Sequence, residues 1–279
     1  MQFSVLISVY RSEEPIILDR ALKSIWDDQI LKPDQIVLIK DGSLGPNLDK
    51  VIEKWATVMG TSLDIICNPV NIGLGNSLRK GVHHCKYDLI ARMDDDDISM
   101  PNRFFEQIKF LKNNPEVDIL GSNVSEFSKD EMIQTSFRKV YTNHETIIKN
   151  AKIQCPFNHP SVIFKKKVYL NAAGPKSLFH MDDWHVWVLM IINGAICANI
   201  DKNLLKMRGG IDQMRRRGGW TYLIQEIKLH KEFYDIKFIN LIEFLRNAAL
   251  GIIIRLLPTV FRQIIYKHII RNVRITKVS

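Results

Sequence analysis

The length, composition and charge of this chain are those of ordinary globular material. Its 279 residues, 46% hydrophobic and 25% charged, suffice for one large α/β domain or for one domain with an appendage. The 4 cysteines lie far apart without a C-x-x-C pair, which favours reduced thiols over a disulfide framework or a zinc site. The first residues enter a predicted strand without the pattern of a signal peptide, so we expect a cytoplasmic protein.

The first half of the chain alternates short apolar runs with segments of helical periodicity. Strands are predicted at residues 3–9, 35–39, 63–67 and 87–93, and helices at 16–26, 48–58, 74–84 and from about 101 to 113. This alternation predicts an α/β fold built on a single, mostly parallel, twisted sheet with flanking helices.

Polar residues follow each of these predicted strands. They are Ser8-Val9-Tyr10, Asp41-Gly42-Ser43, Asn71-Ile72-Gly73 and Asp94 to Asp97. Because the carboxyl ends of parallel strands meet at one edge of a sheet, we expect these four clusters to converge and to bind a ligand there. Neither a G-x-G-x-x-G motif after the first strand nor a G-x-x-x-x-G-K-[ST] loop is present, so neither a Rossmann dinucleotide site nor a phosphate-binding loop is supported.

Four consecutive aspartates, Asp94 to Asp97, follow the fourth strand. Like charges in a row repel one another, and a hard divalent cation is the natural counter-charge for carboxylates. The alternative is a solvated acidic turn in which Asp97 or Ser99 caps the helix that begins near Met100.

The second half of the chain continues the pattern less regularly. Strands are predicted within 117–128 and at 161–164 and 197–200, and helices at 143–151, 165–172, 184–193 and 221–235. A second acidic pair, Asp182-Asp183, precedes one of these helices, where the helix dipole alone also favours it. A Gly- and Arg-rich loop at 206–220 carries Arg215, Arg216 and Arg217.

These clusters together predict one kind of chemistry. A cation that bridges two phosphates makes a nucleoside diphosphate a good leaving group. A carboxylate of the Asp182-Asp183 pair could take the proton of an alcohol, and the three arginines could bind the diphosphate in a loop that closes over it. The sequence therefore predicts group transfer from a nucleoside diphosphate to an alcohol.

The net charge of +9 belongs to the C-terminal part of the chain. Residues 202–279 hold 16 Lys and Arg against 5 Asp and Glu, and no acidic residue follows Phe244. Two amphipathic helices are predicted there, before and after Pro258. The uncharged run Asn247 to Ile254 is too short to span a bilayer, so we expect the helices to lie on an anionic membrane surface. The alternatives are a helical pair that closes the domain core and a dimer contact.

The chain resembles glycosyltransferase family 2, the inverting enzymes with the A-type nucleotide-sugar fold. The segments that carry the resemblance appear in the family's order between residue 3 and about residue 220. They are FSVLISVY at 3–10, IVLIKDGS at 36–43, NPVNIGLG at 68–75, MDDDD at 93–97 with MPNR at 100–103, CPFNHPSV at 155–162 and MDDWHVW at 181–187.

The resemblance implies a role for each matching residue. Ser8 and Tyr10 would line the nucleoside pocket, and Asp41 would accept a hydrogen bond from the uracil. Asp96 would bind the metal, with Asp94 as its D-x-D partner nearer the ribose, and Asp183 would be the general base. We further assign Asn71, Asp95, Arg215, Arg216 and Arg217 to the donor, and Asn158, His159, Asp182 and Trp184 to the acceptor. The chain departs from the family pattern at Asp182, where a Glu is usual, and at Lys40, where many members carry an acid.

The resemblance also implies a specific activity. The enzyme would use Mn²⁺ or Mg²⁺ to move a hexose, expected to be galactose, from a UDP-sugar to a sugar on undecaprenyl diphosphate, in O-antigen or capsule synthesis. It would be attached peripherally to the inner face of the cytoplasmic membrane, without a nucleic-acid partner. Residues 1–220 would form the catalytic domain, with a nucleotide-sugar half (1–120) and an acceptor half (121–220), and residues 221–279 the membrane-association segment.

Two rival functions remain open from the sequence. A haloacid-dehalogenase-type phosphohydrolase also places D-x-D after an apolar strand, but usually after the first strand rather than the fourth. A non-catalytic binder could use the basic tail on nucleic acid, although the tail has few aromatic residues for base stacking.

Overall fold

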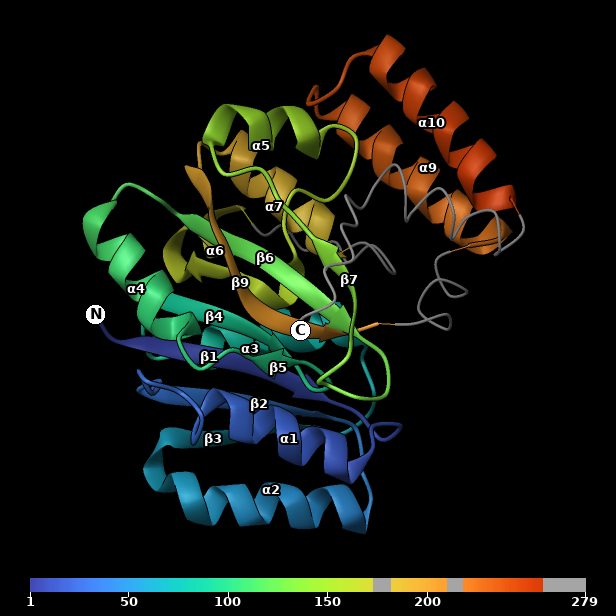
Figure 1. The fold of residues 1–279 in the computed structure, drawn as a ribbon. Coiled ribbons are helices and arrows are strands. Elements are labelled where there is room, and N and C mark those ends of the chain that lie inside the picture. Colours follow the sequence, from blue (N-terminus) through green and yellow to red (C-terminus); the bar gives the residue numbers. More distant parts are fainter. Residues whose placement is uncertain (173–181, 210–217, 258–279) are drawn as a thin grey trace.

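The computed structural model describes residues 1–172, 182–209 and 218–257, and these form a twisted nine-stranded sheet covered by helices on both faces (Figure 1). The strands are β1 (Phe3–Val9), β2 (Gln35–Asp41), β3 (Leu63–Asn68), β4 (Leu89–Asp94), β5 (Ile98–Ser99), β6 (Ile119–Phe127), β7 (Gln134–Arg138), β8 (Ile163–Lys165) and β9 (Cys197–Arg208). The helices are α1 (Pro15–Ile25), α2 (Pro46–Met59), α3 (Leu74–His84), α4 (Arg103–Asn113), α5 (His144–Ala151), α6 (Lys166–Ala172), α7 (Asp182–Ile192), α9 (Trp220–Asp235) and α10 (Leu241–Leu256).

The sheet has the order β3-β2-β1-β4-β8-β6-β9-β5, with β7 paired to β6. The first four strands are parallel, as predicted, so their carboxyl ends share one edge. In the second half only β6 and β9 pair in parallel among the described strands, while β4–β8, β6–β8, β6–β7 and β5–β9 are antiparallel. The expected mostly parallel sheet is therefore a mixed sheet whose N-terminal half is parallel.

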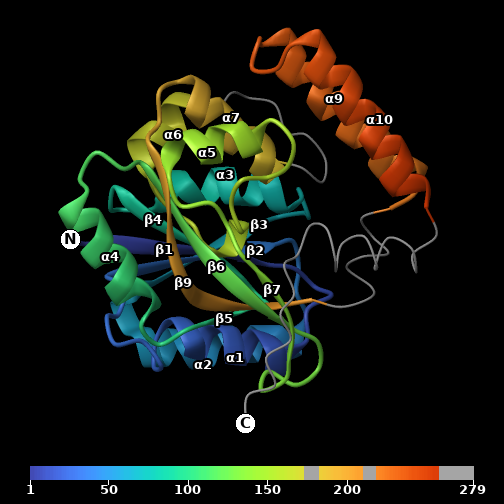
Figure 2. The ribbon, with the colours of Figure 1, turned by 45° about the horizontal axis from the view of Figure 1, so that its top comes forward.

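The two faces of the sheet bury different helices, because alternate residues of a strand point to opposite sides. Val5 and Ile7 of β1 pack with α1, α2 and α4, whereas Leu6, between them, packs in a second core with α3 and α7. Figure 2 shows α1 and α2 on one side of the sheet and α3, α5, α6 and α7 on the other. This arrangement leaves the carboxyl edge of β1, β2 and β4 to the loops.

The end of the described chain forms a helical pair beside α7 (Figures 1 and 2). Leu229 and Phe233 of α9 are fully buried in the same core as Trp187 of α7. In turn α10 packs on α9, where a buried ion pair joins Arg255 to Glu226 at 2.7 Å. Within the described ranges, no helix is both long and apolar enough to cross a membrane.

Candidate active site

The polar clusters that follow β1, β2, β3 and β4 converge on a cavity of about 1350 Å³. The proposed site residues whose side chains the structure describes all line this cavity: Ser8, Tyr10, Asp41, Asn71, Asp94, Asp95, Asp96, Asn158, His159, Asp183 and Trp184. This confirms the expected convergence at the strand ends. The space exceeds the roughly 300–1,000 Å³ of a pocket for one small molecule, so it has room for two substrates.

The four aspartates occupy different environments in this cavity. Asp94, at the end of β4, pairs with the buried guanidinium of Arg92. Asp97 is 1% exposed, and its Oδ1 accepts a hydrogen bond from the backbone N–H of Arg208 at 2.7 Å. The second carboxylate oxygens of Asp95 and Asp97 are buried without a hydrogen-bond partner among the described residues. The alternative prediction of a solvated acidic turn, with Asp97 or Ser99 as the helix cap, is therefore wrong for Asp97. The N-cap residue of α4 is Asn102.

The crowding of these carboxylates raises their proton affinity. Burial, with the negative charges of Asp94 and Glu13, raises the pKa of Asp96 to about 7, against the opposing charge of Arg208. Burial and the neighbouring carboxylates also raise the pKa values of Asp95 and Asp97 well above their usual range. A bound cation would relieve the same repulsion.

The donor set fits a hard divalent ion such as Mn²⁺ or Mg²⁺. It consists of the carboxylate oxygens of the aspartate run, in which Asp95 Oδ2 and Asp97 Oδ2, on either side of Asp96, are buried without partners in the described part of the chain. No group of three His, Cys, Asp or Glu side chains able to hold a metal is found among the described residues. The protein would therefore supply one or two ligands, and the remaining oxygens would come from phosphates and water, as is usual for Mg²⁺.

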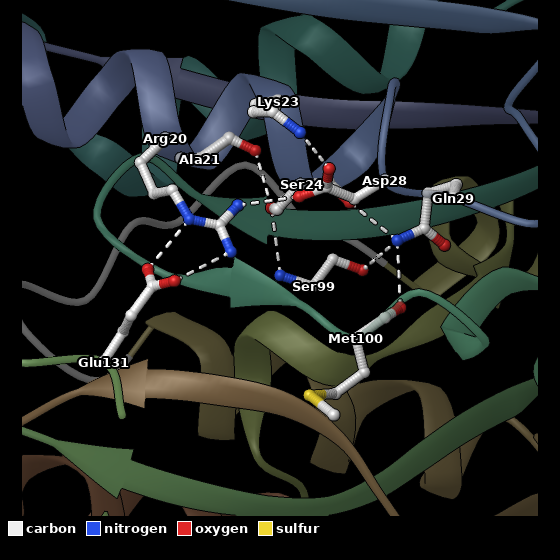
Figure 3. Close-up of polar contacts among 9 residues, drawn as sticks. All are labelled: Arg20, Ala21, Lys23, Ser24, Asp28, Gln29, Ser99, Met100 and Glu131. Carbon is white, nitrogen blue, oxygen red and sulfur yellow. Dashed lines mark hydrogen bonds and ion pairs between the residues drawn. The ribbon is translucent and has the colours of Figure 1, made fainter. Parts of the chain in front are cut away.

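The chain that leaves the aspartates is held in place by α1 and by the loop that follows this helix (Figure 3). The N–H of Ser99 donates to Ser24 Oγ at 3.0 Å, and Gln29 Nε2 donates to the carbonyl of Met100 at 2.9 Å. On the other side β5 pairs with β9, which also delivers Arg208 to Asp96 and Asp97. The carboxylates are therefore fixed from two directions.

The part of the cavity that follows β2 and β3 is organised by Asp41. Its Oδ1 accepts hydrogen bonds from Asn68 Nδ2 at 3.0 Å and from the N–H of Ile72 at 2.9 Å, and its Oδ2 accepts from the N–H of Gly73 at 3.0 Å. Gly42 has φ +85°, and a Cβ there would lie 2.9 Å from the backbone N of Asn71. The D-G-S sequence thus allows β2 and the following turn to approach the Asn71 turn closely.

The opposite part of the cavity, where we expect the acceptor, is built from α7 and the segment before β8. Asp183 lies half-buried in the first turn of α7, and its Oδ1 accepts a hydrogen bond from the N–H of Trp184 at 2.8 Å. His159 accepts a hydrogen bond from Arg92 Nε at 2.9 Å. Burial and the charge of Arg92 lower the pKa of His159 to about 4, so the ring is neutral near pH 7. Arg92, which also pairs with Asp94, thereby connects this carboxylate of β4 to His159.

Two of the predicted acceptor residues also make structural contacts. Asn158 Nδ2 donates to the carbonyl of Ser122 at 2.9 Å, and Trp184 Nε1 donates to the carbonyl of Ala151 at 2.9 Å. The side chain of Asp182 and the residues Arg215, Arg216 and Arg217 lie outside the described residues.

Three residues near the aspartates were not singled out from the sequence. Arg92 lies within an apolar run, and a charge inside a buried strand was the signal that could have found it. Glu13 lies in the polar loop after β1. Arg208 ends β9, a strand predicted to stop eight residues earlier.

Comparisons with known proteins identify the family and the fold of this chain. A family model described as "Glycosyl transferase family 2" matches residues 4–170. A UDP-Gal:alpha-D-GlcNAc-diphosphoundecaprenol beta-1,3-galactosyltransferase of Escherichia coli is 36% identical over 97% of this chain and 97% of its own length. The amylovoran biosynthesis glycosyltransferase AmsE of Erwinia amylovora is 33% identical over 95% of this chain and 98% of its own length.

Solved structures show the same fold at lower identity. S. aureus TarS 1-349 in complex with UDP-GlcNAc has a TM-score of 0.62 and 17% identity, covering 84% of this chain and 67% of that chain. The mannosyltransferase PcManGT from Pyrobaculum calidifontis in complex with GDP-Man and Mn²⁺ has a TM-score of 0.61 and 15% identity, covering 96% and 79%. Both structures share the fold of this chain. The chain belongs to glycosyltransferase family 2 and is a glycosyltransferase, which excludes the phosphohydrolase and non-catalytic alternatives.

Proposed function

We propose that the enzyme is an inverting hexosyltransferase that moves galactose from UDP-galactose to a hydroxyl of a sugar on undecaprenyl diphosphate, in O-antigen or capsule synthesis. The observation that carries the proposal is the shared cavity that holds both the β4 carboxylates and Asp183. The name of the 36% identical E. coli relative supports the choice of donor and acceptor.

On the donor side, Ser8, Tyr10 and Asp41 bind the nucleoside. Asn71 and Asp95 line the part of the cavity that receives the diphosphate and the sugar. Asp96 and Asp94 hold Mn²⁺ or Mg²⁺, which when bound stabilises the negative charge of the leaving diphosphate. Asp41 Oδ2 accepts a hydrogen bond from the N–H of Gly73 and has capacity for a second, from the uracil N–H. The arginines at 215–217 are assigned to the diphosphate on the sequence pattern alone.

On the acceptor side, Asp183 takes the proton of the attacking hydroxyl. A single displacement from the face opposite the diphosphate inverts the configuration at the transferred carbon. Asp183 lies in the first turn of α7, where the N–H of Trp184 donates to its Oδ1 and holds the carboxylate in place. Asn158, His159, Asp182 and Trp184 orient the acceptor sugar.

The acceptor's lipid requires the enzyme to work at a membrane surface, and α10 is suited to it. Ile242, Leu245 and Ile253 of this helix are 78%, 57% and 60% exposed. Between Phe244 and the end of the chain there are seven basic residues and no acidic residue. We therefore assign α10 and the residues after it to peripheral attachment at the inner face of the cytoplasmic membrane, within the proposed segment 221–279. The proposed donor half remains residues 1–120, and the proposed acceptor half remains residues 121–220. The helix α9 joins this acceptor half to α10.

Thermal denaturation with a panel of UDP-sugars tests the donor half. UDP-galactose should raise the melting temperature more than UDP-glucose or UDP-N-acetylglucosamine, and only with Mn²⁺ or Mg²⁺ present. Asp96→Asn should remove the metal-dependent part of this shift. Asp27→Asn, an exposed carboxylate of the α1–β2 loop, is the control. A full metal-dependent shift in Asp96→Asn contradicts the metal assignment.

Asp183→Asn tests the base. The amide oxygen can still accept the hydrogen bond from Trp184, so donor binding should persist. Transfer to a lipid-linked acceptor should fall by roughly 10²–10⁴-fold, the usual contribution of a general base. Transfer within a few-fold of the parent would assign the proton to another group.

A further inference from the structure

Arg92 is a charged residue at the centre of the sheet. It lies in β4, opposite Leu6 of β1, and its side chain is 2% exposed. An unpaired charge at such a position would strongly destabilise the fold, so its contacts identify what it does.

The guanidinium of Arg92 joins the two sides of the active site. Its Nη2 pairs with the carboxylate of Asp94, and its Nε donates to His159 Nε2 at 2.9 Å. The strand beneath is held by hydrogen bonds from Arg103 Nη2 to the Arg92 carbonyl at 2.7 Å and from the Arg92 N–H to Val162 at 2.8 Å. One rigid planar group therefore sets the position of a donor-side carboxylate and of an acceptor-side ring.

This contact determines which nitrogen of His159 carries the proton. Arginine Nε is always a donor, so His159 Nε2 must accept and the proton must reside on Nδ1. Burial and the Arg92 charge keep the ring neutral, since they lower its pKa to about 4. The resulting Nδ1–H is buried and has no hydrogen-bond partner among the residues that the structure describes. A buried donor without a partner is costly unless a ligand accepts its hydrogen bond.

We propose that Arg92 is a positioning residue that holds His159 in the Nδ1–H form, and that this N–H donates to an oxygen of the acceptor sugar beside the attacking hydroxyl. The proposal rests on the proposed function. His159 lines the cavity, and Asp183, the proposed base, is close enough to act electrostatically on the ring. Donation to the attacking oxygen itself would reduce its nucleophilicity, whereas donation to a neighbouring oxygen only orients the sugar.

The tautomer can be measured without any assay of transfer. The measurement is NMR of the full-length enzyme labelled with ¹⁵N-histidine, in which the signals of His159 are those that disappear in His159→Gln. These signals should show that Nδ1 is protonated and that Nε2 is not. They should not change between pH 5.5 and 8, because the ring does not titrate in this range. Arg92→Lys keeps the positive charge but loses the planar guanidinium that bonds Asp94 and His159 together. In this variant the preference for the Nδ1–H tautomer should weaken. A protonated Nε2, or titration of the ring near pH 6.5, in the parent enzyme would overturn the proposal.

Two replacements of His159 separate the role of Nδ1 from that of Nε2. An Asn amide places an N–H near the position of Nδ1, whereas a Gln amide reaches the position of Nε2. His159→Asn should keep the KM for the acceptor within a few-fold, and His159→Gln should raise it about 10- to 100-fold, the range expected for one buried hydrogen bond. Both variants should retain the melting-temperature shift with UDP-sugar and Mn²⁺.

A further experiment identifies which substrate accepts the hydrogen bond from Nδ1–H. A short-chain alkyl diphosphate of N-acetylglucosamine and UDP-galactose are added separately to the labelled enzyme. The Nδ1 proton signal should move with the alkyl diphosphate sugar. Movement with UDP-galactose alone, or equal KM changes in the two variants, would overturn the proposal. If no sugar is transferred although the Nδ1–H form is found, the proposed function fails and the Arg92–His159 geometry stands.

Discussion

At the residue scale, four aspartates that are identical in the sequence have separate roles in the fold. Asp97 holds β9 through the Arg208 N–H, and Asp94 is paired with Arg92. Burial and neighbouring carboxylates raise the pKa values of Asp95, Asp96 and Asp97, and the charge of Arg208 opposes this rise at Asp96. The four side chains are thus distinguished by their partners and not by their charge.

His230 of α9 gives a pH-dependent stability that can be measured. Burial lowers its pKa to about 4, below the usual 6.5, and its Nδ1 lies 3.3 Å from the amide nitrogen of Asn247, a contact that needs a neutral ring. Between pH 6.5 and 4 the unfolded chain binds more protons at this residue than the folded chain. Stability from His230 is therefore lost as pH falls through this window, by about 3 kcal/mol in all.

We expect His230→Phe and His230→Gln to flatten the pH dependence of the free energy of unfolding between pH 6.5 and 4 by the same amount. Urea unfolding at a series of pH values measures it. The two variants should differ only in a pH-independent offset, because Phe keeps the ring packing against Trp184 and Gln does not. A slope equal to that of the parent would contradict a depressed pKa.

At the element scale, α3 lies against the sheet at Gly81. A Cβ at this position would be 2.3 Å from Leu6 Cδ1 and 3.2 Å from Ile39 Cγ1, and both side chains are fully buried. The absence of a side chain therefore determines how closely the helix that follows the Asn71 turn approaches β1 and β2.

Gly81→Ala should lower the free energy of unfolding by about 1–3 kcal/mol, because overpacking outweighs the gain of roughly 1 kcal/mol in helix propensity. Chemical denaturation measures the change. Gly209→Ala is the control and should change stability little, because a Cβ there would lie 3.5 Å from the nearest described atom, in Glu126. An increase in stability for Gly81→Ala would show that α3 can move away from the sheet at no cost.

The elements that could be predicted from the sequence are those with a regular apolar period. Phe3–Val9 and Leu74–His84 match their predicted bounds, because the first is a short apolar run buried on both faces and the second repeats buried apolar residues every four positions. The strand β7 (QTSFR) was missed, since it has one buried residue and lies at an edge. In β9 the exposed Asp201 and Lys202 interrupt the pattern, and the pairing with β6 shifts register there.

The location of the candidate site could be predicted, because it lies where parallel strands end. Parallel strands alone imply that the polar clusters converge, and in the structure these clusters line one cavity. The contact of Arg92 with His159 could not be predicted, because it joins residues 67 positions apart across an antiparallel pairing of β4 and β8. The same limit applies to Arg255, expected at the polar flank of α10 but paired with Glu226 inside the α9–α10 contact.

At the scale of the whole molecule, the proposed membrane contact is concentrated on α10 and the chain after it. Replacing Ile242, Leu245 and Ile253 by Glu should weaken co-sedimentation with vesicles that contain anionic lipid, because each is exposed and contributes apolar area to the surface. Deletion of residues 258–279, which removes five of the seven basic residues after Phe244, should weaken it further and make it less sensitive to salt.

Ile16→Glu is the matched control, because Ile16 is 77% exposed on α1, at the opposite side of the sheet from α7 and α9. It should leave vesicle binding unchanged. Equal binding by the parent and by both altered proteins would instead assign α10 to packing or to contact between copies of the chain.

The attachment of Ser99 to α1, and of Met100 to the loop after this helix, has a consequence for the energetics of ligand binding. Because hydrogen bonds to Ser24 and Gln29 hold the exit of the aspartate turn, its backbone loses conformational entropy when the chain folds and not when a ligand arrives. Binding at the turn then carries little reorganisation cost, so the proposed cation and diphosphate would meet carboxylates already in position. A site of this kind is preorganised by the packing of its neighbours. The helix α1 is part of that preorganisation, although none of its side chains is among the described residues that line the cavity.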